Sequence, residues 1–187
     1  MAGLFAENAA VPADWSAPER WLWEAYRRGE ALDFSDNEDN DPARGDEWGA
    51  HRTVRGAVVE QILRHAPTPH PGHTACLYLI GARISGQLDL TNIRTEAPIV
   101  LTGCFFEQPV ELSGAELNWV ELTGSHLPGI DTTQTRFTRS LTLNRAVVTG
   151  PLRLLWDTYR GQPRTDRRPP DHRERQHRAP GRRHHRR

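Results

Sequence analysis

The hydrophobic pattern of this chain changes character at Leu77. From there to Leu154, apolar residues occupy the first and third places of successive five-residue units. A five-residue period does not follow the 3.6-residue turn of an α-helix, whereas side chains two residues apart in a strand point to the same side. We therefore predict a chain that turns a corner every five residues, so that four sides close one coil of about 20–22 residues.

The third places of these units supply the predicted core. The first places alternate between large and small residues, which puts Cys104 in a small-residue column inside the coils. Glycines at fifth places, such as Gly103 and Gly124, mark corners where the backbone angles are unusual. A sandwich of short alternating strands is the alternative, but it does not explain columns that stay in register. The third-place residues expected inside are Leu79, Ile84, Leu90, Leu101, Phe106, Leu112, Leu117, Leu122, Leu127, Phe137, Leu143, Val148 and Leu154.

The region before the repeats has the pattern of two helices. Ser16 and Glu19 fit a capping box for the first helix, and Gly29 is a natural end for it. The second helix is expected from about Trp48 to His65, because apolar residues recur there at three- and four-residue steps.

These patterns divide the chain into four segments. A helical head covers residues 1–66 and contains an acidic loop at 33–47, and a Pro- and His-rich linker spans 67–76. The β-helix occupies 77–155, and an Arg-rich tail covers 156–187. The tail contains no Ile, Leu, Val or Phe, so it cannot bury enough apolar surface to offset the entropy of ordering and is expected to be disordered.

The repeat units resemble those of the pentapeptide-repeat proteins. The resemblance covers residues 77–154, in units such as Ala115-Glu-Leu117-Asn-Trp. It implies an all-β solenoid, a right-handed quadrilateral β-helix of about four coils. The head motif Trp21-Leu-Trp-Glu-Ala-Tyr26 is similar to the leader of an actinobacterial branch that is often labelled "membrane-associated oxidoreductase". No dinucleotide fingerprint, redox CxxC motif or long apolar span accompanies that label, and we expect no cofactor.

The net charge of zero is the sum of three unlike parts. Residues 1–60 hold 6 Arg and 13 acidic residues, which gives −7. Residues 61–156 hold 7 of each, and residues 157–187 hold 11 Arg and 4 acidic residues, which gives +7. The chain is thus an acidic head, a neutral middle and a basic tail, and its overall isoelectric point says little about partners.

The second places of the repeat units are expected to point outward. One outer column contains Asp89, Glu111 and Asp131, followed by Arg153, and its three acidic members are our candidate interaction face. Some pentapeptide-repeat proteins mimic DNA and bind type II topoisomerases such as gyrase through an acidic face, so the resemblance implies this as an alternative function. The middle of the chain is neutral, which makes the expected field of such a face weak. The first interpretation is a non-enzymatic scaffold that binds a protein partner still to be identified.

The acidic loop has the twelve-residue frame of a calcium-binding loop. Asp36 stands at its first place and Glu38 at its third, with Asn40 at the fifth and Glu47 at the twelfth. The sixth place, where a calcium loop needs glycine, holds Asp41. We therefore expect a flexible polar loop with too few apolar residues to pack, and no metal.

Four residues near the linker are of the types that bind zinc: His65, His70, His73 and Cys76. Their spacing matches no standard zinc knuckle, so the segment is expected to be a linker that leads into the first coil. No Ser, His or Asp lies in a nucleophile motif, and we predict no catalytic residue.

The repeat pattern stops abruptly after Leu154, where the tail begins. We interpret the tail as an out-of-frame translation of GC-rich DNA, because its back-translation into GC-rich codons, with one base dropped near Trp156, is compatible with a reading that continues the pentapeptides. The last coil would then be an open edge, and self-association through it is expected. Alternatively, the arginines of the tail could bind nucleic acid non-specifically by releasing counterions from phosphates.

Composition also bears on location. No apolar run is long enough to span a bilayer, and the first apolar residues follow no basic segment of the kind that begins a secretory signal. Two cysteines cannot build a disulfide framework. The expected compartment is the cytoplasm.

Overall fold

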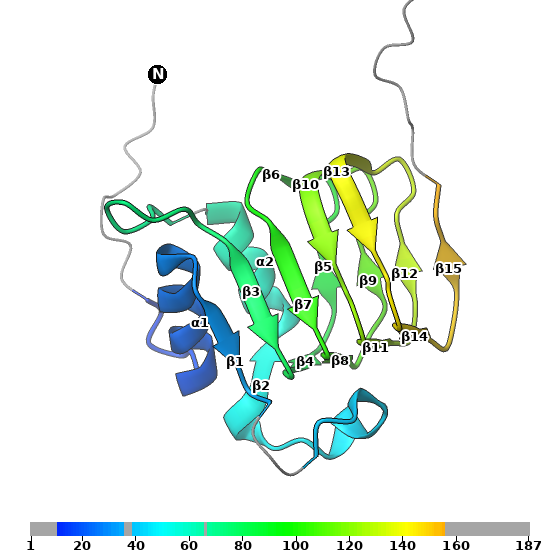
Figure 1. Cartoon of the computed structure of the whole chain (residues 1–187), viewed down its shortest axis with the longest axis horizontal. Helices are drawn as coiled ribbons and strands as arrows, with labels where there is room; N and C mark the ends of the chain where they lie inside the picture. Colours follow the sequence, from blue (N-terminus) through cyan, green and yellow to red (C-terminus); the bar gives the residue numbers. More distant parts are fainter. Residues whose placement is uncertain (1–10, 36–38, 66, 156–187) are drawn as a thin grey trace, which may run out of the picture.

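The computed structural model describes residues 11–35, 39–65 and 67–155 and shows a parallel β-solenoid of about four turns (Figure 1). The predicted all-β solenoid, with a helix at its N-terminal end, is confirmed. The tail prediction, including the out-of-frame interpretation, lies outside the described residues. Neither α-helix within the described ranges combines the length and the apolarity needed to cross a bilayer.

Short strands follow one another around the coil, and each pairs in parallel with a strand of the next coil. The first sheet contains, in order, β1 (Ala31–Asp33), β3 (Leu77–Ile80), β7 (Ile99–Thr102), β10 (Glu116–Glu121) and β13 (Arg136–Thr142), with β6 (Arg94–Thr95) paired to β10. The second contains β2 (Thr53–Arg55), β4 (Arg83–Ser85), β8 (Phe105–Phe106), β11 (His126–Leu127) and β14 (Val147–Val148). The third contains β5 (Leu88–Asp89), β9 (Val110–Glu111), β12 (Ile130–Asp131) and β15 (Leu152–Arg153).

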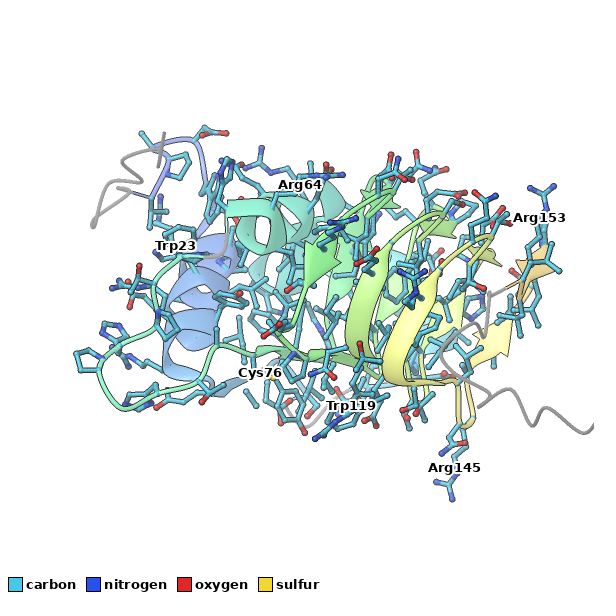
Figure 2. The ribbon with its side chains drawn as sticks, turned by 90° about the horizontal axis from the view of Figure 1, so that it is seen from above. Trp23, Arg64, Cys76, Trp119, Arg145 and Arg153 are labelled. Carbon is cyan, nitrogen blue, oxygen red and sulfur yellow. The ribbon has the colours of Figure 1, made fainter. Side chains whose placement is uncertain are left out.

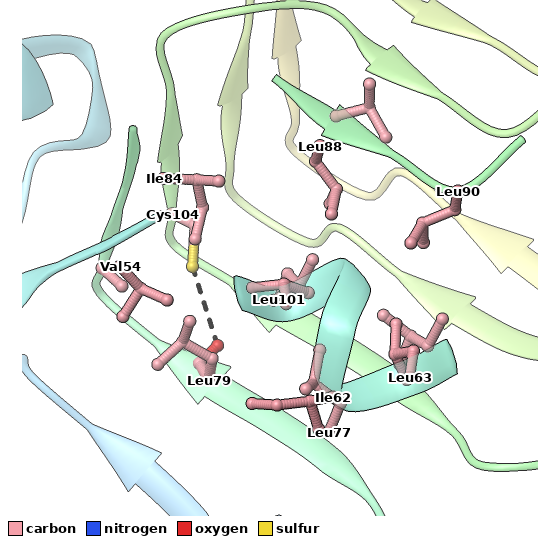
Figure 3. Packing of buried hydrophobic residues seen from close by; sticks show 14 of the residues in the cluster. Val54, Ile62, Leu63, Leu77, Leu79, Ile84, Leu88, Leu90, Leu101 and Cys104 are labelled. Carbon is pink, nitrogen blue, oxygen red and sulfur yellow. Dashed lines mark hydrogen bonds between the residues drawn. The ribbon is translucent and has the colours of Figure 1, made fainter. Parts of the chain in front are cut away.

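The inward-pointing residues form one continuous core. Most of the third-place residues are at most 1% exposed: Leu79, Ile84, Leu90, Leu101, Phe106, Leu112, Leu117, Leu122 and Leu127. Figure 3 shows several of them packed around Cys104, whose thiol donates to the carbonyl of Leu79 at 3.7 Å. In the last coil, burial is incomplete. Phe137, Leu143, Val148 and Leu154 are only partly buried, because no further coil of described residues covers them.

Helical elements occupy the N-terminal end. They are α1 (Ala17–Arg28), α2 (Gly56–His65) and two short 3-10 helices, η1 (Pro42–Glu47) and η2 (Ala50–Arg52). The capping box expected for α1 is present: the backbone N–H of Glu19 donates to the Ser16 hydroxyl, and the Ser16 N–H donates to the Glu19 carboxylate at 2.7 Å. The helix ends at Gly29, whose φ of 64° is left-handed.

The second helix begins later than predicted, at Gly56 instead of Trp48. The intervening residues include β2, which pairs with β4 so that Val54 lies in register with Ile84. Both side chains are fully buried. The prediction was wrong because Val54 fits the apolar stripe of a helix and the inner face of a strand equally well, and pairing with the repeats decides between them.

The head thus supplies most of a coil in front of the first repeat. β1 extends the first sheet, β2 extends the second, and α2 packs against β5 of the third. Ile62 and Leu63 of α2 point into the core among the leucines of the first two coils (Figure 3). α1 packs against β1, β2 and β3, at the blue end of the solenoid in Figure 1. This end is therefore closed, and the head shares one core with the repeats.

Many corners of the coils use left-handed backbone angles, as predicted from the glycine positions, although Gly150 does not. Gly103 and Gly124 have φ of 59° and 66°. The same conformation occurs without glycine at Asn92, Gln134 and Arg145, each with φ of 57°. A residue with a Cβ is strained in this region, so these three corners are less favourable than their glycine counterparts.

Candidate interaction surfaces

The structure aligns the acidic column predicted from the repeats. Asp89 lies in register with Glu111, Glu111 with Asp131, and Asp131 with Arg153. Successive members are therefore one strand spacing apart, about 4.8 Å. We call Asp89, Glu111 and Asp131 the acidic ladder. It follows the third sheet along its outer face.

The two aspartates of the ladder are held by neighbouring residues. The Asp131 carboxylate accepts hydrogen bonds from the Thr133 hydroxyl at 2.6 Å and the Thr133 N–H at 2.8 Å, and from Arg153 at 3.2 Å. These contacts lower the pKa of Asp131. Hydrogen bonding from Thr91, whose N–H donates at 2.9 Å, likewise lowers the pKa of Asp89. The carboxylates of Asp89 and Asp131 are therefore stabilised in their negatively charged form.

Glu111 differs from its two neighbours. Among the described residues its carboxylate has no hydrogen-bond or ion-pair partner, and its side chain is partly buried. Burial raises the pKa of Glu111, the negative charges of Asp131 and Asp89 raise it further, and the positive charge of Arg153 offsets only part of this. A positive group placed opposite Glu111 would relieve this repulsion.

Arginines surround the ladder. Arg153 stands at its C-terminal end, and Arg64 of α2 donates to the carbonyl of Thr91 beside its N-terminal end at 3.1 Å. On the adjoining side of the coils, the carboxylate of Glu116 pairs with two arginines, Arg94 at 3.3 Å and Arg136 at 3.0 Å. The negative field of the ladder is thus partly cancelled close to the surface.

A segment of the head covers the outer face of the second sheet. Residues 39–48, which we call the strap, include η1, and η1 packs against β8 and β11. Gly45 lies directly on the Phe105 side chain, so closely that a Cβ at this position would overlap it. The Arg83 guanidinium donates to the backbone carbonyls of Asp46 at 2.6 Å and Trp48 at 3.2 Å. This face is therefore occupied by the chain itself.

Arg52 links the strap to Gly81 at a corner of the first coil. Its guanidinium is 3.8 Å from the centre of the Trp48 ring and donates from Nε to the Gly81 carbonyl at 2.8 Å. It also donates to the Asp39 carbonyl at 3.3 Å. The residue is 4% exposed. The expectation that the loop does not pack is wrong for the strap, because hydrogen bonds from Arg52 and Arg83 to backbone carbonyls hold a segment that is poor in apolar residues.

The calcium frame does not form a cation site in the part of the chain that the structure describes. The side-chain carbonyl of Asn40 accepts from Arg52 at 3.4 Å, and the Glu47 carboxylate accepts from Arg44 at 2.7 Å. No group of three or more His, Cys, Asp or Glu is gathered there for a metal. Asp36 and Glu38 lie outside the described residues.

The zinc-type residues near the linker are bound to other partners. His70 is 3.3 Å from the Glu24 carboxylate, and His73 is 2.8 Å from the carbonyl of Arg28. The backbone N–H of His70 donates to the backbone carbonyl of Arg27 at 2.9 Å. Within residues 11–35, 39–65 and 67–155 they form no metal cluster with His65 or Cys76. The linker instead packs along the C-terminal end of α1.

Neither cysteine is poised for thiol chemistry. Cys104 is fully buried, and burial raises its pKa to about 12. Burial also raises the pKa of Cys76. A reactive thiol requires a lowered pKa and access to solvent, so the two sulfurs give no support to the oxidoreductase label.

The outer face of the first sheet was not singled out by the sequence. Among the elements that the structure describes, no helix or strand lies in front of β3, β7, β10 and β13 in Figure 1. Its outward column reads Tyr78, Val100, Glu121 and Thr142 in register. Trp119 projects on this side (Figure 2). The sequence signal was the aromatic residue Trp119 at a fifth place, a position that holds glycine in several other units.

No protein-family model, curated protein or solved structure matches this chain at a significant level.

Proposed function

We propose that this chain is a cytoplasmic protein-interaction scaffold of the pentapeptide-repeat type, and that its partner contacts the acidic ladder. The observation that carries the proposal is Glu111. Its carboxylate lies between Asp89 and Asp131, is partly buried and has no hydrogen-bond or ion-pair partner among the described residues. A lysine or arginine of a partner, placed opposite Glu111, would gain a charge-assisted hydrogen bond and remove the like-charge repulsion.

The solenoid suits this role because its outward side chains are fixed before binding. Backbone hydrogen bonds between coils hold the column in place, for example from the Leu112 N–H to the Asp131 carbonyl at 2.8 Å. The Asp131 side chain is further fixed by Thr133 and Arg153. A partner therefore meets a preorganised row of charges and does not bear the entropy cost of ordering it.

The test is crosslinking of partners to the full chain, with variants on two opposite faces. We expect Glu111→Arg to abolish the crosslinked partner and Glu111→Gln to weaken its capture. The matched control is Glu121→Gln, because Glu121 lies on the first sheet and accepts from its own neighbour Thr123 at 2.9 Å. Capture that is equal for all variants would show that the ladder is not the contact.

A second candidate function is binding of a type II topoisomerase by DNA mimicry. Three carboxylates stacked in register at strand spacing favour it, whereas Arg64 and Arg153 at the ends of the ladder weaken it. Inhibition of gyrase supercoiling at micromolar protein, increased by Arg153→Gln, supports this candidate. Unchanged supercoiling with both proteins refutes it and leaves the scaffold proposal standing.

A further inference from the structure

The C-terminal end of the described solenoid differs from the closed N-terminal end. β13, β14 and β15 are each the last strand of their sheet, and among the described residues each has a strand on one side only. Parallel strands left in this way present unpaired N–H and C=O groups that another extended segment can use.

This end is also strongly basic. Residues 132–155 contain Arg136, Arg139, Arg145 and Arg153 and no acidic residue. Arg139 and Arg145 have no ion pair with a described residue. Figure 2 shows Arg145 and Arg153 projecting from this end of the ribbon.

The other two arginines of this end, Arg136 and Arg153, both pair with acidic residues. Arg153 pairs with Asp131 and Arg136 with Glu116, in each case across one coil and in the same outward column. In both pairs an arginine faces an acid on the neighbouring coil. On the open side, no described acid lies in register with these arginines.

Apolar side chains accompany the arginines. Val147, Leu152 and Leu155 are 52%, 50% and 66% exposed. Phe137 and Leu143, which point inward, are only partly buried. An occupant of this end must therefore supply backbone edges, apolar side chains and negative charge together.

We propose that the open end binds an acidic, extended segment of another protein, which adds strands to β13, β14 and β15. Its alternate apolar residues would cover Leu143 and Leu152, and its outward acids would face Arg145 and Arg153. Residues 157–187 of the chain carry 11 Arg and 4 acidic residues, so they do not supply this negative charge. A second copy docked end to end would bring the same four arginines together, which opposes association.

The probe is a fluorescent peptide that copies residues 110–131, an acidic coil of this chain that contains Glu111, Glu116, Glu121 and Asp131. We expect it to bind the full chain in fluorescence anisotropy. Binding should weaken at least tenfold when these four acids are replaced by Gln or Asn. It should weaken to the same degree with the protein variant Arg139→Glu/Arg145→Glu, and partly with Arg139→Gln/Arg145→Asn, in which Asn tolerates the left-handed corner.

Two controls separate this site from other surfaces. Arg20→Glu, an exposed position on α1, should leave binding unchanged. Glu111→Arg, which tests the scaffold proposal, should also leave it unchanged, so the two proposals fail independently. Equal binding of a scrambled peptide of the same composition would show charge attraction without strand pairing and overturn the proposal. Concentration-dependent dimers in light scattering with no peptide binding would identify a second copy as the occupant and also overturn it.

Discussion

The guanidinium of Arg55 in β2 donates two hydrogen bonds to the carboxylate of Glu19 in α1, from Nε at 2.7 Å and from Nη2 at 2.8 Å. The same carboxylate accepts from the backbone N–H of Arg55 at 3.1 Å and from that of Ser16 at 2.7 Å. Glu19 is 1% exposed. One acidic residue therefore caps α1 and ties it to the strand that extends the second sheet.

This contact predicts acid-sensitive stability. Burial alone would raise the pKa of Glu19, but hydrogen bonds from Arg55 and Ser16 outweigh it and hold the pKa at about 2, against 4.5 for a free glutamate. Because the folded pKa is the lower one, the contribution is full above pH 4.5 and is lost as the pH falls toward 2. Glu19→Gln should cost about 2 kcal/mol at neutral pH, measured by urea denaturation, and the difference from the parent should shrink below pH 4.5.

Glu24→Gln on the same helix is the control for this prediction. Glu24 is 3.7 Å from Arg27 at the surface, where ion pairs contribute about 0–1 kcal/mol. A loss of stability as large as that of Glu19→Gln, or a difference that persists unchanged at pH 3, would contradict the role assigned to the Glu19 carboxylate.

The left-handed corner at Gln134, which lacks a glycine, predicts a stabilising substitution. Gln134 is exposed and has a φ of 57°, so Gln134→Gly should relieve strain and raise the free energy of unfolding by about 0.5–1 kcal/mol. Gln108→Gly is the matched control, since Gln108 is exposed without a positive φ and should lose a few tenths of a kcal/mol, roughly. Thermal unfolding of both variants measures the difference, and equal shifts of the midpoint temperature would argue against strain at Gln134.

The converse substitution is Gly114→Ala. Gly114 has a φ of 68°, and an added Cβ would overlap the side-chain oxygen of Asn92 on the neighbouring coil. We expect a loss of about 1–3 kcal/mol in the free energy of unfolding by urea denaturation. Asn92→Gly removes the steric overlap and also the strained φ of Asn92 itself, so it serves as the reference background. In that background Gly114→Ala should still cost about 1 kcal/mol because the φ at position 114 stays strained. No loss relative to the Asn92→Gly single variant would show that the Gly114 corner carries no strain.

The sequence was enough to predict the solenoid and the register of its outer columns. The reason is that a five-residue period assigns every residue a place, so Asp89, Glu111 and Asp131 could be aligned before the structure was known. Single extra residues, such as Gln87 and Pro98, fall only between the five-residue units and leave this assignment intact. A repeat architecture is local and periodic, and periodicity is what a sequence displays directly.

The head could not be predicted in the same way. Val54 suits a helix or a strand, and only the edge of β4 makes it a strand. The strap is held by Arg83 and Arg52, whose partners include carbonyls 29 to 37 residues away in the sequence. Hydrogen bonds from side chains to distant backbone groups follow no period, so neither the strap nor its position over Phe105 was visible in the sequence.

The buried thiol predicts a difference in reactivity between the two cysteines. Cys104 is fully buried with a pKa of about 12, whereas Cys76 is half-buried. Under native conditions iodoacetamide should modify Cys76 at least tenfold faster than Cys104, as measured by mass spectrometry of the peptides. Labelling of Cys104 should rise with urea along the unfolding transition. Rapid labelling of Cys104 without denaturant would mean that the second coil opens locally.

Burial along the solenoid predicts a gradient of stability. Leu101 in the second coil is 1% exposed, whereas Leu143 in the last coil is only partly buried. Leu101→Ala should therefore cost about 3–4 kcal/mol in the free energy of unfolding, and Leu143→Ala roughly half of that or less. Because each coil is stabilised by its neighbours, amide hydrogens of β13, β14 and β15 should exchange faster than those of β7. Equal losses for the two variants together with uniform exchange would show that the last coil is as firmly packed as the second.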